Sequence, residues 1–211
     1  MNDCIGRKKM LVTRIKEVTK QKSEVWLEEE KTFTLYKSEL TKYHIKEGQE
    51  LSEESYQEIT TCLLPKRAKL RAMNLLQTKD YTQKQLKDKL LQGGYGEAIA
   101  EEAMEYVKSY HYVDDLRFCK NYISYRLEQK SRKKLEMELM QKGVSKEVIL
   151  QAFNELSENG QTIDEITMIT ELLEKKKFDK DAADRKEMAR MYGFLSRRGF
   201  SQDAIQKVLF R

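Results

Sequence analysis

A short segment occurs three times in this chain, and a segment that recurs at a regular period decides the architecture before any single motif does. The two best-matched copies are KGVSKEVI at 142–149 and RGFSQDAI at 198–205, and a weaker copy, GGYGEAIA, lies at 93–100. Shifts of 49 and 56 residues bring the copies into register, together with the apolar positions that flank them. The sequence therefore predicts a tandem repeat.

Each copy has the residues of a joint between two helices. Gly143 and Gly199 stand where a helix ends in a left-handed residue, which a Cβ would disfavour by roughly 1 kcal/mol. Ser145 and Ser201 are then expected to cap the helix that follows. Apolar residues at helical spacing, among them Leu139, precede each glycine. A further helix comes before each joint, and we expect these helices at 66–78, 115–129 and about 164–177.

The first fifty residues have a different pattern. The stretches 10–18, 24–29 and 32–36 are rich in β-formers and partly alternating, which predicts a small antiparallel meander. Val25 and Leu27 share one face of it, as do Phe33 and Leu35. A short helix near 37–43 with Gly48 as its stop is expected next, and Ser52 is expected to cap the helix after it.

These patterns together predict a mainly α fold. It consists of three tandem three-helix, helix-turn-helix-like repeats in an elongated curved array, preceded by the small β-meander. The expected boundaries are 1–50 for the β-rich extension and 51–113, 114–162 and 163–211 for the three repeats.

Composition excludes several classes of protein. Charged residues make up 36% of the chain and hydrophobic residues 39%, a balance typical of amphipathic helices with long solvated faces. No run of about 18 apolar residues exists, and the N-terminus lacks the pattern of a secretory signal, so we expect a cytoplasmic protein without a membrane anchor. The three cysteines, Cys4, Cys62 and Cys119, match neither a disulfide framework nor a metal site.

No catalytic or metal-binding pattern is present, so we expect neither an enzyme nor a cofactor. His44 and His111 have no metal-ligand partner at helical spacing, and no phosphate-binding glycine loop or nucleophile motif occurs. Asp114 and Asp115 are the one carboxylate pair of interest. A helix cap followed by a first-turn acid accounts for both of them.

Positive charge is concentrated in one part of the chain. The net charge is −1 over residues 1–64 and +6 over 65–211, and between 117 and 134 the only acid is Glu128. A local excess of this kind indicates a binding face for a polyanion, or for a protein filament that coats one; an ordinary solvated face is the alternative. The residues expected on this face are Arg117, Arg126, Lys130, Arg132, Lys133 and Lys134, with Lys66, Arg67, Arg71, Arg197 and Arg198.

The central repeat resembles the RecX family of bacterial regulators. YVDDLRFCKNYISYR at 112–126 and SRKKLEMELMQKGVSKEVI at 131–149 carry the family pattern. The positions that match most clearly are Asp114, Asp115, Phe118, Leu139 and Gly143, with Gly199 in the weaker third repeat. The likeness covers about 66–211. Family members usually have glycine where His111 stands, and often where Ser131 stands; here Ser131 is expected to cap a helix.

The resemblance implies a function that the residues alone do not. RecX-like proteins bind RecA, above all its filament on single-stranded DNA, and lodge in the helical groove of that filament. They thereby curb strand exchange, ATP turnover and the co-protease activity. The resemblance implies a role in DNA repair, homologous recombination and the SOS response. We expect the protein to be a monomer. Contact with single- or double-stranded DNA stays open.

Two other functions are compatible with the repeats. One is a helix-turn-helix DNA-binding regulator that does not depend on RecA, and the other is a helical-repeat scaffold that binds a protein through apolar seams. A DNA-recognition helix needs several Arg, Asn or Gln on its outer face, whereas SKEVILQAFNEL at 145–156 is acidic and apolar.

Overall fold

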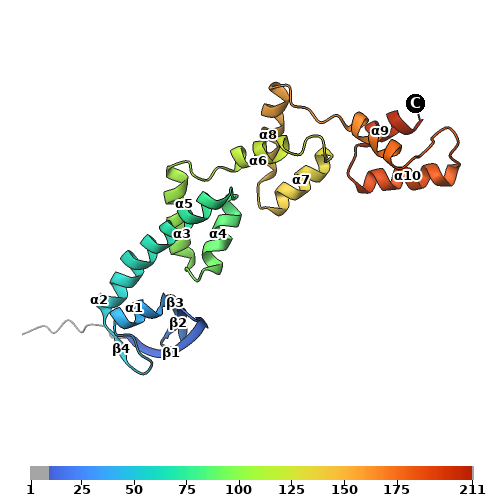
Figure 1. Ribbon diagram of the computed structural model, residues 1–211. Helices are drawn as coiled ribbons and strands as arrows, with labels where there is room; N and C mark the ends of the chain where they lie inside the picture. The colour runs from blue at the N-terminus through green and yellow to red at the C-terminus, as the bar shows by residue number, and fades with distance from the viewer. Residues whose placement is uncertain (1–9, 211) are drawn as a thin grey trace, which may run out of the picture. The chain divides into compact units, whose positions relative to one another are not determined.

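The computed structural model describes residues 10–210 and is mainly helical, with a small sheet near its N-terminal end (Figure 1). The helices after residue 63 form three three-helix bundles, as the repeat predicts. The chain divides into two compact units. The first holds the sheet and the first bundle; the second holds the other two bundles together with Thr82–Lys84.

The sheet has four antiparallel strands in the order β3-β2-β1-β4. Their bounds are β1 Met10–Thr19, β2 Lys22–Leu27, β3 Glu30–Tyr36 and β4 Glu50–Leu51. Val25, Leu27, Phe33 and Leu35 are all buried, which confirms the predicted covered face. Ile59 from the helical segment that follows packs into the same apolar cluster. The sheet therefore packs against a helix, as a sheet this small requires for stability.

The connection from sheet to helices differs from the prediction at one point. Helix α1, Lys37–Lys42, lies where a short helix was expected. Gly48 does not end it, however, because the left-handed residue that follows α1 is His44, with φ 52°. Gly48 lies instead in the turn that leads to β4. A strand of two residues is too short to show an alternating pattern in the sequence.

A continuous helical segment runs from residue 53 to residue 78. It comprises α2 Glu53–Gln57, the π-helical turn η1 Glu58–Leu63 and α3 Leu64–Thr78. Ser52 caps its start by accepting a hydrogen bond from the Ser55 N–H, as predicted. Pro65 lies in the first turn of α3, directly after the π turn. Because proline lacks an N–H and crowds the preceding turn, the wider π turn accommodates it.

Arg67 of α3 fastens the first bundle to the sheet. Its guanidinium donates to the carbonyl oxygen of Thr34 at 2.6 Å, forms an ion pair with Glu39, and lies over the rings of Tyr36 and Tyr95. Only 15% of the side chain is exposed. The structure therefore removes Arg67 from the basic face expected from the sequence. Its charge is used inside the first unit.

Each bundle buries the apolar stripe predicted for it, as in Leu86, Leu139 and Leu195. Two first helices are shorter than predicted, because α6 ends at Ser124 and α9 at Lys175. The bounds of the remaining helices are α4 Gln83–Gln92 and α5 Glu97–Ser109, α6 Asp115–Ser124, α7 Arg132–Gln141 and α8 Lys146–Glu158, and α9 Glu165–Lys175, α10 Arg185–Arg197 and α11 Gln202–Phe210.

The glycines of the repeated joint are required for two reasons. Gly143 and Gly199 have φ values of 88° and 85°, which confirms the left-handed conformation predicted for them. A Cβ on Gly199 would also lie 2.9 Å from Oγ of Ser131 and 3.4 Å from the backbone N of Lys134. Gly199 therefore permits both the turn after α10 and a close approach of the second bundle.

Replacing Gly199 should lower the free energy of unfolding by more than the strain of its left-handed conformation alone would. We expect Gly199→Ala to lower the free energy of unfolding by about 2–3 kcal/mol, because it adds a steric clash to an unfavourable φ. Gly160→Ala is the matched control, since Gly160 has φ 77° but a Cβ there would meet open space. It should cost only about 1 kcal/mol. Denaturant unfolding measures both, and equal losses would contradict the close approach.

Candidate anion-binding cleft between the second and third helical bundles

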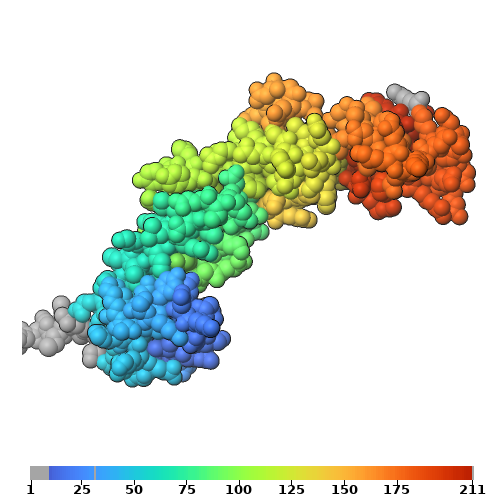
Figure 2. Space-filling view, in the orientation of Figure 1, coloured from blue at the N-terminus to red at the C-terminus, as the bar shows by residue number. Residues whose placement is uncertain are grey.

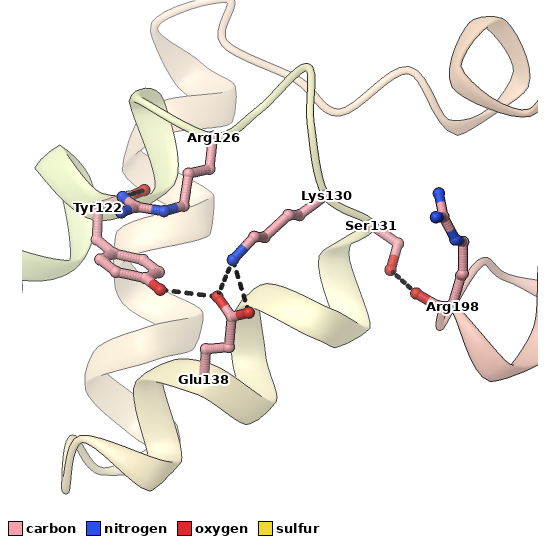
Figure 3. Close-up of polar contacts among 6 residues, drawn as sticks. All are labelled: Tyr122, Arg126, Lys130, Ser131, Glu138 and Arg198. Carbon is pink, nitrogen blue, oxygen red and sulfur yellow. Dashed lines mark hydrogen bonds and ion pairs between the residues drawn. The ribbon is translucent and has the colours of Figure 1, made fainter. Parts of the chain in front are cut away.

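A buried hydroxyl group joins the second and third bundles. Ser131, which directly precedes α7, is 2% exposed, and its Oγ donates a hydrogen bond to the carbonyl oxygen of Arg198 at 2.9 Å (Figure 3). The expectation that Ser131 caps α7 is therefore wrong. It occupies the cap position, but its side chain makes no capping bond because the hydroxyl is directed to the next bundle.

A carboxylate completes this joint. One oxygen of Glu165 accepts from the backbone N–H of Arg132 at 3.3 Å, and the other accepts from that of Ser201 at 2.8 Å. Glu165 thus binds the N-terminal ends of one helix in each bundle, where helix dipoles favour negative charge. The atoms of the two bundles accordingly meet without a break in the space-filling view (Figure 2).

The same arrangement occurs a second time in this unit. Oγ1 of Thr82 donates to the carbonyl oxygen of Lys142 at 2.6 Å, and a carboxylate oxygen of Asp115 accepts from the N–H of Gln83 at 2.8 Å. Thr82 and Lys142 correspond to Ser131 and Arg198 under the shifts of 49 and 56 residues. The same pair of contacts therefore occurs twice within the second unit.

The paired acids of the family pattern have separate roles in these joints. Asp114 caps α6 by accepting from the Arg117 N–H at 3.0 Å, as the sequence predicts. Asp115 was expected only to favour the start of α6, and its bond to Gln83 shows a further role that the sequence does not reveal. Phe118 stacks on Tyr122, and Leu139 lies in the buried core of the second bundle.

A cleft of about 560 Å³ opens at the joint of Ser131 and Arg198. The acids among its lining residues are Glu128 and Glu171. Its basic lining residues come from both bundles and are Lys130, Lys134, Lys175, Arg197 and Arg198. Four of these five were expected on a basic face and belong to two different repeats, which the structure brings together.

Lys175 is the member of this set that the sequence analysis missed. It is the last residue of α9, and its ion pair with Glu171, at 3.4 Å, is exposed. The segment from 175 to 195 is longer than its counterparts in the other repeats. The repeat pattern therefore does not predict where the helix ends, or that Lys175 lies beside the cations of the second bundle. Lys134 and Arg197 are exposed and, within residues 10–210, have no ion pair.

Other predicted basic residues bind groups of their own bundle. The guanidinium of Arg126 lies 3.9 Å from the ring centre of Tyr122, and Lys130 forms an ion pair with Glu138 at 2.6 Å. The hydroxyl of Tyr122 donates to the same carboxylate at 2.7 Å (Figure 3). Counting charges from 117 to 134 overlooks Glu138 because that acid lies one turn and more beyond the counted segment.

These contacts fix the protonation state of Glu138. Its partial burial opposes ionisation, yet hydrogen bonds from Lys130 and Tyr122 outweigh that effect and hold the pKa of the carboxyl below its usual value. Burial and the bond to Glu138 raise the pKa of Tyr122, so its hydroxyl remains a donor at neutral pH. At neutral pH the result is an ionised and internally paired cluster beside the cleft.

The remaining predicted residues lie outside the cleft. Arg132 pairs with Glu136 at 2.9 Å and lies over the ring of Phe153, and both Arg132 and Lys133 line a separate cavity of about 860 Å³ on the same joint. Three further residues are exposed at other places, namely Lys66 and Arg71 on α3 and Arg117 on α6.

Among residues 10–210 no cluster of three or more His, Cys, Asp or Glu could hold a metal ion. Burial, with the charges of Asp115 and Asp114, raises the pKa of the Cys119 thiol to about 12, so it stays protonated. None of the helices in this part of the chain has both the length and the apolar character needed to cross a bilayer.

Three descriptions of protein-family domains match the chain in order. They are the first three-helix domain of RecX over residues 68–106, the second over 114–152 and the third over 163–209. The matched ranges coincide with the three bundles and leave out the sheet.

Whole proteins of the same description are similar to the chain. The regulatory protein RecX of Caldanaerobacter subterraneus subsp. tengcongensis is 31% identical over 202 residues, which cover 95% of this chain and 98% of that protein. The regulatory protein RecX of Clostridium tetani is 27% identical over 80% of this chain and 77% of its own length.

Two crystal structures have the same fold. A regulatory protein RecX superposes with a TM-score of 0.62 at 19% identity, covering 94% of this chain and 98% of its own. RecX from Lactobacillus salivarius gives a TM-score of 0.58 at 20% identity, covering 69% of this chain and 94% of its own.

The Glu138 cluster predicts a pH-dependent contribution to stability. We expect Glu138→Gln to lower the free energy of unfolding by about 1–2 kcal/mol at pH 7, because it removes charge-assisted hydrogen bonds from a carboxylate that is 17% exposed. Since the folded pKa of Glu138 is depressed, its contribution is complete above the unfolded pKa of about 4.3 and disappears as pH falls through the folded pKa.

Urea unfolding of both proteins from pH 7 to pH 3 measures this difference. Glu136→Gln is the control, because its pair with Arg132 is a more exposed i,i+4 contact worth about 0.5 kcal/mol or less. A Glu138→Gln difference that stays constant with pH would show that the carboxylate does not hold its charge in this cluster.

Proposed function

The chain belongs to the RecX family, and from this membership we propose that it binds RecA and the RecA nucleoprotein filament and mostly inhibits the recombinase, ATPase and co-protease activities. The single observation that carries the proposal is the match of all three RecX domains, in order, to the three bundles. The proposal places the protein in the cytoplasm as a monomer that acts in DNA repair, homologous recombination and the SOS response.

The exposed cations of the second unit are the contact surface that we propose. Lys133, Lys134, Arg197 and Arg198 are exposed and come from two bundles that the Ser131 joint holds together. A RecA filament on single-stranded DNA is a polyanion covered by protein, and a surface of cations at fixed spacing suits such a partner. Lys66 and Arg71 of the first unit extend the proposed set.

Other cations of the predicted basic face already have partners within their own bundle, which makes them less suitable for contact with RecA. Arg126, Lys130 and Arg132 are each held by an aromatic ring or an acid of their own bundle. Reversing their charge would disturb contacts within the bundle as well as any contact with a partner. They are therefore poor reporters of RecA binding, as is Arg198, whose guanidinium lies over the ring of Phe194. Lys134 and Arg197 are exposed, have no such contact in the described part of the chain, and are better reporters.

A DNA-binding regulator that acts without RecA fits the structure less well. The third helices of the bundles would have to serve as recognition helices, and α5 exposes Glu97, Glu101, Glu102 and Glu105. In the second bundle, α8 exposes Glu147 and Glu158. These carboxylates would repel DNA phosphates in a major groove.

The proposal is tested by RecA ATP hydrolysis on single-stranded DNA. We expect the wild-type protein to suppress turnover at amounts below one molecule per RecA, because binding to a filament affects many protomers at once. The double variant Lys134→Glu with Arg197→Glu should need at least about tenfold more protein for the same inhibition, since each reversed charge turns attraction into repulsion.

The charge-matched control is Lys146→Glu with Arg185→Glu. Both residues are exposed, lie outside the cleft and, in the described part of the chain, have no ion pair. This variant should inhibit RecA as the wild type does. Absence of any wild-type effect on RecA turnover would refute the proposed function, whereas equal inhibition by all three proteins would refute only the contact surface.

A further inference from the structure

The cleft beside the Ser131 joint has an excess of positive charge that the protein does not compensate. Its lining includes five basic residues and two acids. Glu171 is engaged by Lys175, and Lys130 is engaged by Glu138 from outside the lining set. Among the described residues Arg197 and Arg198 form no ion pair, and Lys134 forms none either, although its charge acts on Glu138. These three cations stand against Glu128, the one remaining acid of the lining.

These cations approach one space from two bundles. Lys134 lies in the first turn of α7, whereas Arg197 and Arg198 lie at the end of α10. The Ser131 Oγ bond to the Arg198 carbonyl holds the two ends together (Figure 3). Like charges held at close quarters repel one another, so the apo protein gains from any multivalent anion that enters between them.

We propose that this cleft is a binding site for an oligophosphate, a ligand in which several linked phosphate groups contact cations of both bundles. The volume of about 560 Å³ lies within the range of small-molecule sites. A single carboxylate would leave the lining with a net positive charge. Linked phosphates carry one or more charges each and match the fork of an arginine side chain with paired oxygens.

The proposal has a mechanical consequence. Because Lys134 belongs to the second bundle and the two arginines to the third, a bound oligophosphate adds bonds across the joint. Met168, Leu172 and Phe200 form an apolar part of the same lining, which leaves room for a non-phosphate portion of the ligand. The triphosphate of a free nucleotide and the backbone of a nucleic acid share the required chemistry.

Thermal unfolding and calorimetric titration of the full-length protein without RecA test this site. The probes are inorganic tripolyphosphate, ATP without added metal, and a short oligothymidine strand. With probe in about hundredfold excess over its dissociation constant, we expect the midpoint of unfolding to rise by about 5 °C. Tripolyphosphate or ATP binding identifies a free oligophosphate as the ligand, and binding of the strand alone identifies a nucleic-acid backbone.

The cleft variant is Lys134→Gln with Arg197→Gln, and the control is Lys146→Gln with Arg185→Gln, which removes the same charge elsewhere. We expect the cleft variant to bind the active probe at least tenfold more weakly and the control to bind it as the wild type does. Equal weakening in both variants would show general charge attraction and overturn the site. No binding of any probe by a folded wild-type protein would overturn it as well, and neither result depends on RecA.

Discussion

The structure of the second unit depends on one close contact, in which a buried hydroxyl group reaches the carbonyl oxygen at the end of a helix in the next bundle. Ser131 makes it to Arg198, and Thr82 makes it to Lys142. In each case the residue after the carbonyl is a left-handed glycine, and a Cβ there would collide with the preceding segment. The first unit has a related contact, because a Cβ on Gly94 would lie 2.5 Å from Oγ1 of Thr34 in the sheet. The sheet therefore meets the first joint glycine with a hydroxyl side chain, as Ser131 does for Gly199, whereas a Cβ on Gly143 would meet the side chain of Lys84. Within the first unit the sheet caps the first bundle, as terminal caps do in other repeat proteins.

This contact also organises the charge of the second unit. By bringing the start of α7 to the end of α10, it places cations of two repeats around one cleft. Acids within each bundle neutralise the cations that lie further in, such as Lys130 beside Glu138. Cations without a neighbouring acid are therefore found at only a few positions on the described surface. Binding of an anionic partner depends on which cations are left over, and not on the total number of basic residues.

The sequence predicts the features that repeat and the features that are local. The left-handed glycines, the cap at Asp114 and the apolar stripes all follow from spacing within about twenty residues. Contacts between distant segments could not be predicted, because nothing in a single sequence pairs Arg67 with Glu39 or Ser131 with Arg198. The candidate cleft shows both cases. Lys134 and Arg197 were recognisable as basic residues, but their convergence and the contribution of Lys175 required the three-dimensional arrangement.

The joint itself is tested most directly by a double-mutant cycle between Ser131 and Gly199. A Cβ at position 199 would meet Oγ of Ser131, so removing that oxygen should relieve part of the clash. We expect Ser131→Ala combined with Gly199→Ala to be more stable than the sum of the single losses implies, by about 1 kcal/mol in the free energy of unfolding. Strictly additive losses would show that these two residues do not touch, and that the second and third bundles are not held together at this point.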